Sequence, residues 1–104
     1  MNEVTLVNRS YQLIRKDLGL EEKLEIGEGN STFDWLVMYL EKQINYLLDH
    51  DFNRLINSMY RIDIPDHRVN ELLHSSKQGE LALNIAKAIV EREKQKVLTR
   101  MNYQ

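Results

Sequence analysis

Three histidines are the first side chains to test for metal chemistry in this sequence of 104 residues. His67 and His74 are seven positions apart, so on one helix they share a face but stand about two turns from each other. That separation is too long for one metal ion without further ligands. Neither the HExxH pattern nor the spacing of a calcium-binding EF-hand loop occurs. We therefore interpret His50, His67 and His74 as turn and surface residues, and we expect no metal and no cofactor.

The serines and glycines do not form a catalytic pattern either. Ser31, Ser75 and Ser76 lie at predicted helix starts, where serine is favoured for capping alone. Gly27 and Gly29 adjoin glutamates that would repel a phosphate. The absence of cysteine excludes disulfides and thiolate chemistry. We expect a protein that is not an enzyme and has no small-molecule substrate.

Glu93 is the most informative polar residue, because it lies on an apolar line of the last predicted helix. The line is Ala86, Val90, Glu93 and Val97. An unpaired buried carboxylate is costly, so we expect a cationic partner, with Arg61 the first candidate and Arg54 the second. We interpret the contact as a structural ion pair that fixes the register of two helices, with ligand binding as the alternative.

Four large side chains suggest a surface for a protein partner: Trp35, Met38, Tyr39 and Tyr46. They run beside the inward stripe of the second predicted helix, and aromatic residues and methionine are enriched at interface centres. The alternative is that the first helix or the segment around Leu24 and Ile26 covers them. We expect self-association, as a homodimer, through this helix or the last one.

Charge is unevenly distributed along the chain. Residues 1–52 carry ten acids and five bases, a net of −5, whereas residues 53–104 carry nine bases and six acids, a net of +3. A nucleic-acid-binding protein usually concentrates basic residues far more strongly. The basic last helix also lacks interleaved aromatic residues that could stack on single-stranded bases. Weak nucleic-acid binding through this helix is therefore the alternative function.

No segment is typical of a signal peptide or of a membrane helix. The N-terminus lacks a basic stretch followed by an apolar one, and no apolar run approaches the roughly 20 residues that a membrane span needs. We expect a cytoplasmic protein without membrane contact.

The spacing of apolar residues predicts helices throughout. The first helix spans about residues 3–18 and ends at Gly19, where a glycine suits the left-handed conformation. A glutamate-rich loop follows over about residues 21–30. The second helix begins at Ser31, which together with Asp34 resembles a capping box.

The sequence 49–51, Asp-His-Asp, predicts a tight turn with Asp51 capping a third helix over residues 52–61. The alternative is one continuous helix from Ser31 to Arg61. Pro65 marks the next boundary, with Asp63 as the expected cap of a short fourth helix that ends near His74. The last helix spans about residues 80–101.

Residues 55–63, Leu-Ile-Asn-Ser-Met-Tyr-Arg-Ile-Asp, and residues 91–96, Glu-Arg-Glu-Lys-Gln-Lys, resemble a group of short bacterial all-helical proteins of uncharacterised activity. The stretch 49–52 is similar too, and the resemblance covers about the last two thirds of the chain. Pro65 stands where such proteins often place serine. The resemblance implies a shared cluster of Tyr60, Arg61, Asp63, Arg92 and Glu93, and it carries no activity.

Together these observations predict one all-α domain over residues 1–104, a compact bundle of four to five helices. The predicted function is a protein–protein interaction module or homodimer. The alternative is a regulatory adaptor that binds nucleic acid weakly.

Overall fold

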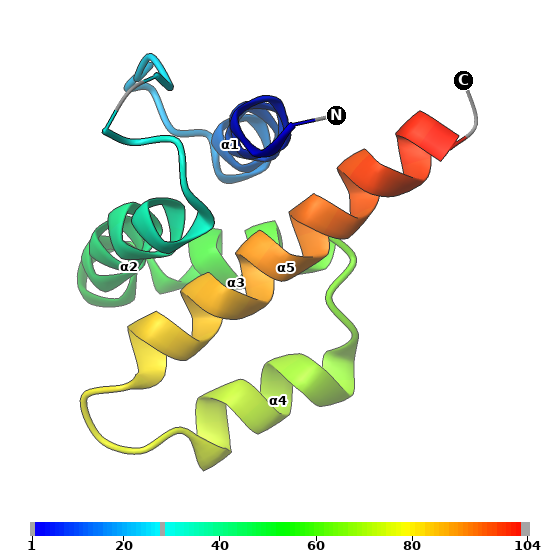
Figure 1. The fold of residues 1–104 in the computed structure, drawn as a ribbon. Coiled ribbons are helices and arrows are strands. Elements are labelled where there is room, and N and C mark those ends of the chain that lie inside the picture. The colour runs from blue at the N-terminus through cyan, green and yellow to red at the C-terminus, as the bar shows by residue number, and fades with distance from the viewer. Residues whose placement is uncertain (1, 28, 103–104) are drawn as a thin grey trace.

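Five helices make up the chain in the computed structural model, which describes residues 2–27 and 29–102 (Figure 1). They are α1 (Glu3–Leu18), α2 (Phe33–His50), α3 (Phe52–Arg61), α4 (Asp66–Ser75) and α5 (Leu81–Asn102). No strand occurs among the described residues. The prediction of an all-α bundle of four to five helices is confirmed.

Both ends of α1 are closed by local hydrogen bonds. The Asn2 side chain accepts a hydrogen bond from the Thr5 N–H at 2.9 Å. Gly19 ends the helix with φ 65°, a left-handed conformation that glycine adopts without steric cost. The Leu20 N–H then donates to the Arg15 carbonyl at 2.9 Å. The predicted bounds and the glycine stop of this helix are confirmed.

The start of α2 differs from the prediction by one residue. Thr32, and not Ser31, is the cap, because its hydroxyl accepts the hydrogen bond from the Trp35 N–H at 3.1 Å. The break after α2 is confirmed but is narrower than expected. Only Asp51 leaves the helical conformation, and its carboxylate accepts from the Arg54 N–H at 3.2 Å to cap α3.

The boundary at Ile62–Pro65 is confirmed, but Asp63 does not cap α4. Asp63 has φ 69° and lies in the turn that follows α3. Pro65 occupies the cap position without a side-chain hydrogen bond, and its carbonyl accepts from the N–H groups of Arg68 and Val69. The cap prediction was wrong because Asp63, in its left-handed conformation, belongs to the turn that ends α3 and not to the start of α4.

The last helix, α5, is the centre of the arrangement. It packs against α1, α2 and α4, while α3 packs against α1 and α2. In Figure 1, α5 runs diagonally, with α4 on one side of it and α1 and α2 on the other. The core consists of side chains that lie at helical spacing on each inward face, among them Tyr11, Ile14, Leu36, Leu40, Ile44, Leu55, Met59, Ile85 and Ile89.

The segment between α1 and α2 has no regular structure, yet it is fixed at several points. The Tyr11 hydroxyl donates to the Glu22 carbonyl at 3.2 Å and accepts from the Leu24 N–H at 2.8 Å. Leu24 and Ile26 are half-buried against the core. This segment therefore lies over the part of α1 that carries Tyr11.

Candidate functional site

The four residues predicted to form a partner surface lie on α2 and differ in exposure. We call Trp35, Met38, Tyr39 and Tyr46 the α2 surface. The rings of Trp35 and Tyr39 stack at 5.4 Å and are half-buried. Met38 and Tyr46 are 62% and 58% exposed. The α2 surface is thus an aromatic pair seated on the core, flanked by two apolar side chains in solvent.

Tyr39 is the member of the α2 surface that the rest of the molecule covers. Its ring meets the Tyr11 ring of α1 edge-on at 6.0 Å. Burial, together with the nearby Tyr11 and Glu22, raises the pKa of Tyr39 to about 12, so its hydroxyl stays protonated. The expected alternative, cover by the first helix, therefore applies to Tyr39.

Tyr46 borders a hollow at the other end of α2. The Tyr46 ring stacks on the His50 ring at 4.3 Å. A cavity of about 310 Å³ lies between Tyr46, Gln43 and Leu47 on α2 and residues 19–22 beyond α1.

Arg54 and Arg61 do not pair with a carboxylate. Arg54 donates from Nε and Nη2 to the Leu18 carbonyl, at 3.1 and 2.7 Å, and from Nη2 to the Gly19 carbonyl at 2.6 Å. Arg61 donates from Nη1 to the Asp17 carbonyl at 3.1 Å. Both guanidinium groups from α3 thus close the C-terminal end of α1, where carbonyls lack helical partners and the helix dipole is negative.

Glu93 is fully buried, as predicted, but its neighbours are not those predicted. Lys96 Nζ lies 3.2 Å from Glu93 Oε1 and 3.8 Å from Asp17 Oδ2. Neither Glu93 carboxylate oxygen has a hydrogen bond of good geometry. The prediction of an Arg61–Glu93 pair was wrong, because Glu93 faces Asp17 of α1 while Arg61 reaches the α1 main chain.

The environment of Glu93 favours its protonated form. Burial and the Asp17 carboxylate raise the pKa of Glu93 to about 7, against the opposing effect of Lys96. We call Asp17, Glu93 and Lys96 the carboxyl cluster. Sequence reasoning missed Asp17 and Lys96. The i,i+3 spacing of Lys96 from Glu93 is a local signal that could have found the lysine, whereas nothing local points to Asp17.

The expected ion-pair cluster of Arg54, Arg61, Asp63, Arg92 and Glu93 does not form. The only ion pairs among the described residues are the two of the carboxyl cluster and an exposed Arg68–Glu71 pair. Asp63 is exposed in its turn, and Arg92 lines a separate hollow of about 410 Å³ with Ile64 and Pro65. The five residues divide among four places because α3 packs on α1 and not on the face of α5 that carries Arg92.

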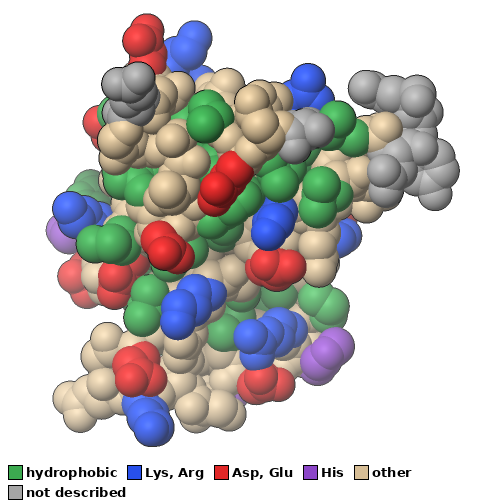
Figure 2. Space-filling model, in the orientation of Figure 1, with side chains coloured by type: hydrophobic (Ala, Val, Ile, Leu, Met, Phe, Trp, Pro, Cys, Tyr) green, Lys and Arg blue, Asp and Glu red, His purple; other side chains and the backbone are tan. Residues whose placement is uncertain are grey.

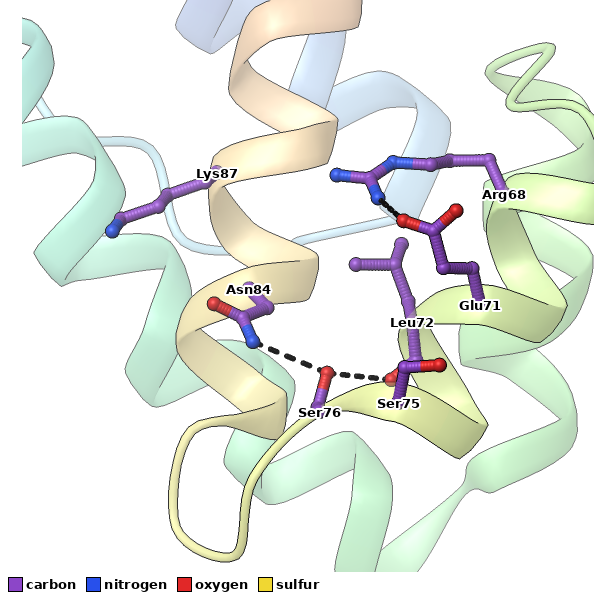
Figure 3. Close-up of a pocket in the computed structure, with 7 residues that line it drawn as sticks. All are labelled: Arg68, Glu71, Leu72, Ser75, Ser76, Asn84 and Lys87. Carbon is purple, nitrogen blue, oxygen red and sulfur yellow. Dashed lines mark hydrogen bonds and ion pairs between the residues drawn. The ribbon is translucent and has the colours of Figure 1, made fainter.

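A further hollow, of about 270 Å³, lies between α4 and α5 (Figure 3). Its polar groups satisfy one another. Asn84 donates to the Ser76 hydroxyl at 3.2 Å, which donates to the Leu72 carbonyl at 2.6 Å. Figure 3 shows Lys87 extending away from this polar group. The hollow therefore lacks a set of side chains that converge on a ligand.

Neither a metal-binding cluster nor a membrane-spanning helix is found in the described part of the chain. No group of three or more His, Cys, Asp or Glu side chains there could hold a metal ion. No helix in that part is long and apolar enough to cross a membrane.

Comparisons of the chain with protein-family models, with curated proteins and with solved structures found no match. The resemblance to short bacterial helical proteins stays a prediction.

Proposed function

We propose that this chain is a cytoplasmic protein–protein interaction module that self-associates through the α2 surface and has no catalytic role. The observation that carries the proposal is the exposure of two apolar side chains of α2: Met38, which lies one turn from the half-buried Trp35, and Tyr46, two turns further along. Burying aromatic and methionine side chains at the centre of a contact is the main source of affinity in many interfaces.

Met38 and Tyr46 are separated by two helical turns, with Lys42 between them on the same side of α2. This spacing suits a second helix packed along α2. Side chains of that second helix would contact Met38 at one end and fill the cavity beside Tyr46 at the other. A second copy of α2 in antiparallel orientation offers the same two anchors in the reverse order, which is the arrangement of a two-fold symmetric dimer.

Self-association is tested by light scattering coupled to size-exclusion chromatography, over a concentration series of the full chain. We expect the mass to rise towards that of a dimer in the micromolar range. Met38→Lys and Tyr46→Lys should each shift association to at least about tenfold higher concentration, because a charge is then desolvated at the interface.

Leu98→Lys is the matched control, because Leu98 is an exposed apolar side chain on α5. Loss of association in Leu98→Lys but not in the α2 variants would place the interface on the last helix. A monomer at every concentration would contradict self-association altogether.

The alternative function, weak nucleic-acid binding through α5, has less support. Lys96 is held in the carboxyl cluster, and Lys94 lies over the Phe33 ring at 4.7 Å from its centroid. On the face shown in Figure 2, Lys and Arg side chains alternate with Asp and Glu over α4 and α5 and form no continuous basic patch. A salt-sensitive shift of an RNA or DNA probe would revive this alternative.

A further inference from the structure

The contact of α1 with the rest of the molecule holds all the buried side-chain atoms that lack a hydrogen bond among the described residues. These are Ser10 Oγ, Tyr39 OH and both carboxylate oxygens of Glu93. Ser10 belongs to α1, Tyr39 packs on Tyr11 of α1, and Glu93 faces Asp17 of α1. Buried polar groups without a hydrogen bond oppose docking, so these atoms lower the stability of the α1 contact.

The remaining helices contact one another without α1. α2 packs on α3 and α5, and α4 packs on α5. The connection from α1 to α2 has no regular structure, so α1 can leave its site without breaking another helix. Local opening of one element at lower free energy than global unfolding is common in small proteins.

We infer that Asp17, Glu93 and Lys96 form a proton-operated latch that holds α1 against α5. With Glu93 protonated, the Asp17 carboxylate and the Lys96 ammonium balance, and the cluster is neutral. Loss of that proton leaves one net negative charge in the contact, and this charge favours the opening of α1. This inference is independent of self-association through the α2 surface.

The charged groups that act on Glu93 come from two helices, α1 and α5. Asp17 faces it from α1, and Lys96 lies one turn along α5 at 3.2 Å. Arg61 of α3 lies on the Asp17 carbonyl, where its hydrogen bond holds the end of α1. The proton that the latch gains or loses belongs to Glu93, whose pKa is the one that the cluster raises.

The direction of the pH response follows from the raised pKa of Glu93, about 7 against its ordinary 4.5. Glu93 regains the ordinary value once α1 has left and water reaches the carboxyl group. The docked state therefore binds more protons than the open state between these two values, and opening increases as the pH rises. Linkage gives an increase of about tenfold in the opening constant between pH 6 and pH 8.

Release of α1 uncovers the part of α5 on which α1 packs, together with its own apolar line of Val7, Tyr11, Ile14 and Leu18, all of which are buried in the closed state. The latch would thus make a second apolar surface accessible about ten times more often at pH 8 than at pH 6.

Native-state hydrogen exchange of the full chain tests the latch. Amides of α1 and of α2 are followed at pH 6 and pH 8 in low concentrations of urea, with the intrinsic pH dependence of exchange removed. We expect α1 amides to exchange through an opening with a smaller urea dependence than the slowest α2 amides. That opening should become about tenfold more populated at pH 8.

Glu93→Gln removes the titrating group, and the α1 opening in this variant should be the same at both pH values. Glu91→Gln, an exposed carboxylate on the same helix, is the matched control and should behave as the wild type does. The latch is refuted if α1 and α2 amides of the wild type share one opening constant and one urea dependence. It is equally refuted if the α1 opening of the wild type does not change between pH 6 and pH 8.

Discussion

At the scale of single residues, two polar groups that contact α1 have opposite effects on stability. Arg54 satisfies carbonyl groups that a helix end leaves open, whereas Glu93 brings a carboxyl group into a place where nothing bonds it well. A carboxyl in such a site is tolerated by staying protonated. Glu93 is therefore a source of pH dependence and not of net stability.

Glu93→Gln should abolish most of the pH dependence of stability between pH 5 and pH 8. The pKa of Glu93 in the folded state, about 7, lies above its ordinary value of 4.5. Its contribution to the stability of the wild type is therefore complete below pH 4.5 and is lost as the pH rises to 7. The loss should be about 2–3 kcal/mol between pH 5 and pH 8. Urea unfolding at each pH measures it.

Comparing the variant with the wild type at each pH cancels the titration of all other groups. Glu91→Gln is the control here too, since an exposed carboxylate should leave the slope unchanged. If the free energy of unfolding changed equally with pH in Glu93→Gln and in the wild type, ionisation of Glu93 would cost the folded state no stability.

At the scale of elements, α3 acts as the cap of α1. Gly19 ends α1 in a left-handed conformation, and a Cβ at this position would lie 3.3 Å from Arg54 Nη2. The absence of a side chain at Gly19 thus lets the guanidinium approach two carbonyls at once. Sequence separation hides this pairing, because Arg54 and Leu18 are 36 positions apart.

Replacing Arg54 by methionine should destabilise the protein by about 1.5–3 kcal/mol, the range for hydrogen bonds to a charged group. Arg54→Lys should recover little of that loss, because an ammonium lacks the planar fork that binds both carbonyls. Urea unfolding at pH 6 measures both variants.

Arg68→Met provides the comparison, since Arg68 forms an exposed i,i+3 pair with Glu71 and should contribute under about 1 kcal/mol. If Arg54→Lys were as stable as the wild type, the positive charge alone, and not the planar guanidinium, would stabilise the end of α1.

At the scale of the whole molecule, the sequence predicts the elements better than their contacts. Helix bounds follow from local features: a glycine stop at Gly19, a cap at Asp51 and a proline at Pro65, each within a helix turn of the break that it marks. The burial of Glu93 follows from its place on an apolar line. These features need no knowledge of the tertiary arrangement.

The partners of Glu93 and Arg61 depend instead on which helices cross. The prediction assumed that α5 packs against α3, whereas α5 lies mainly against α2 and α1. No local pattern near Asp17 indicates that α1 covers Glu93. The difference in exposure within the α2 surface also depends on tertiary packing. Tyr39 is covered because Tyr11 of α1 lies against it, whereas Met38 stays exposed.

The central position of α5 leads to a last prediction, about cooperativity. Ile89 is fully buried in the middle of the helix that joins α1, α2 and α4. Ile89→Ala should therefore destabilise the protein by about 2–5 kcal/mol, through lost burial and the cavity that it leaves. Leu98→Ala, at a 41% exposed position of the same helix, should cost under about 1 kcal/mol. Circular dichroism and the fluorescence of Trp35, the single tryptophan, should give one coincident unfolding transition in each variant. Separate transitions by the two probes in Ile89→Ala would show that α2 and α5 do not share one core.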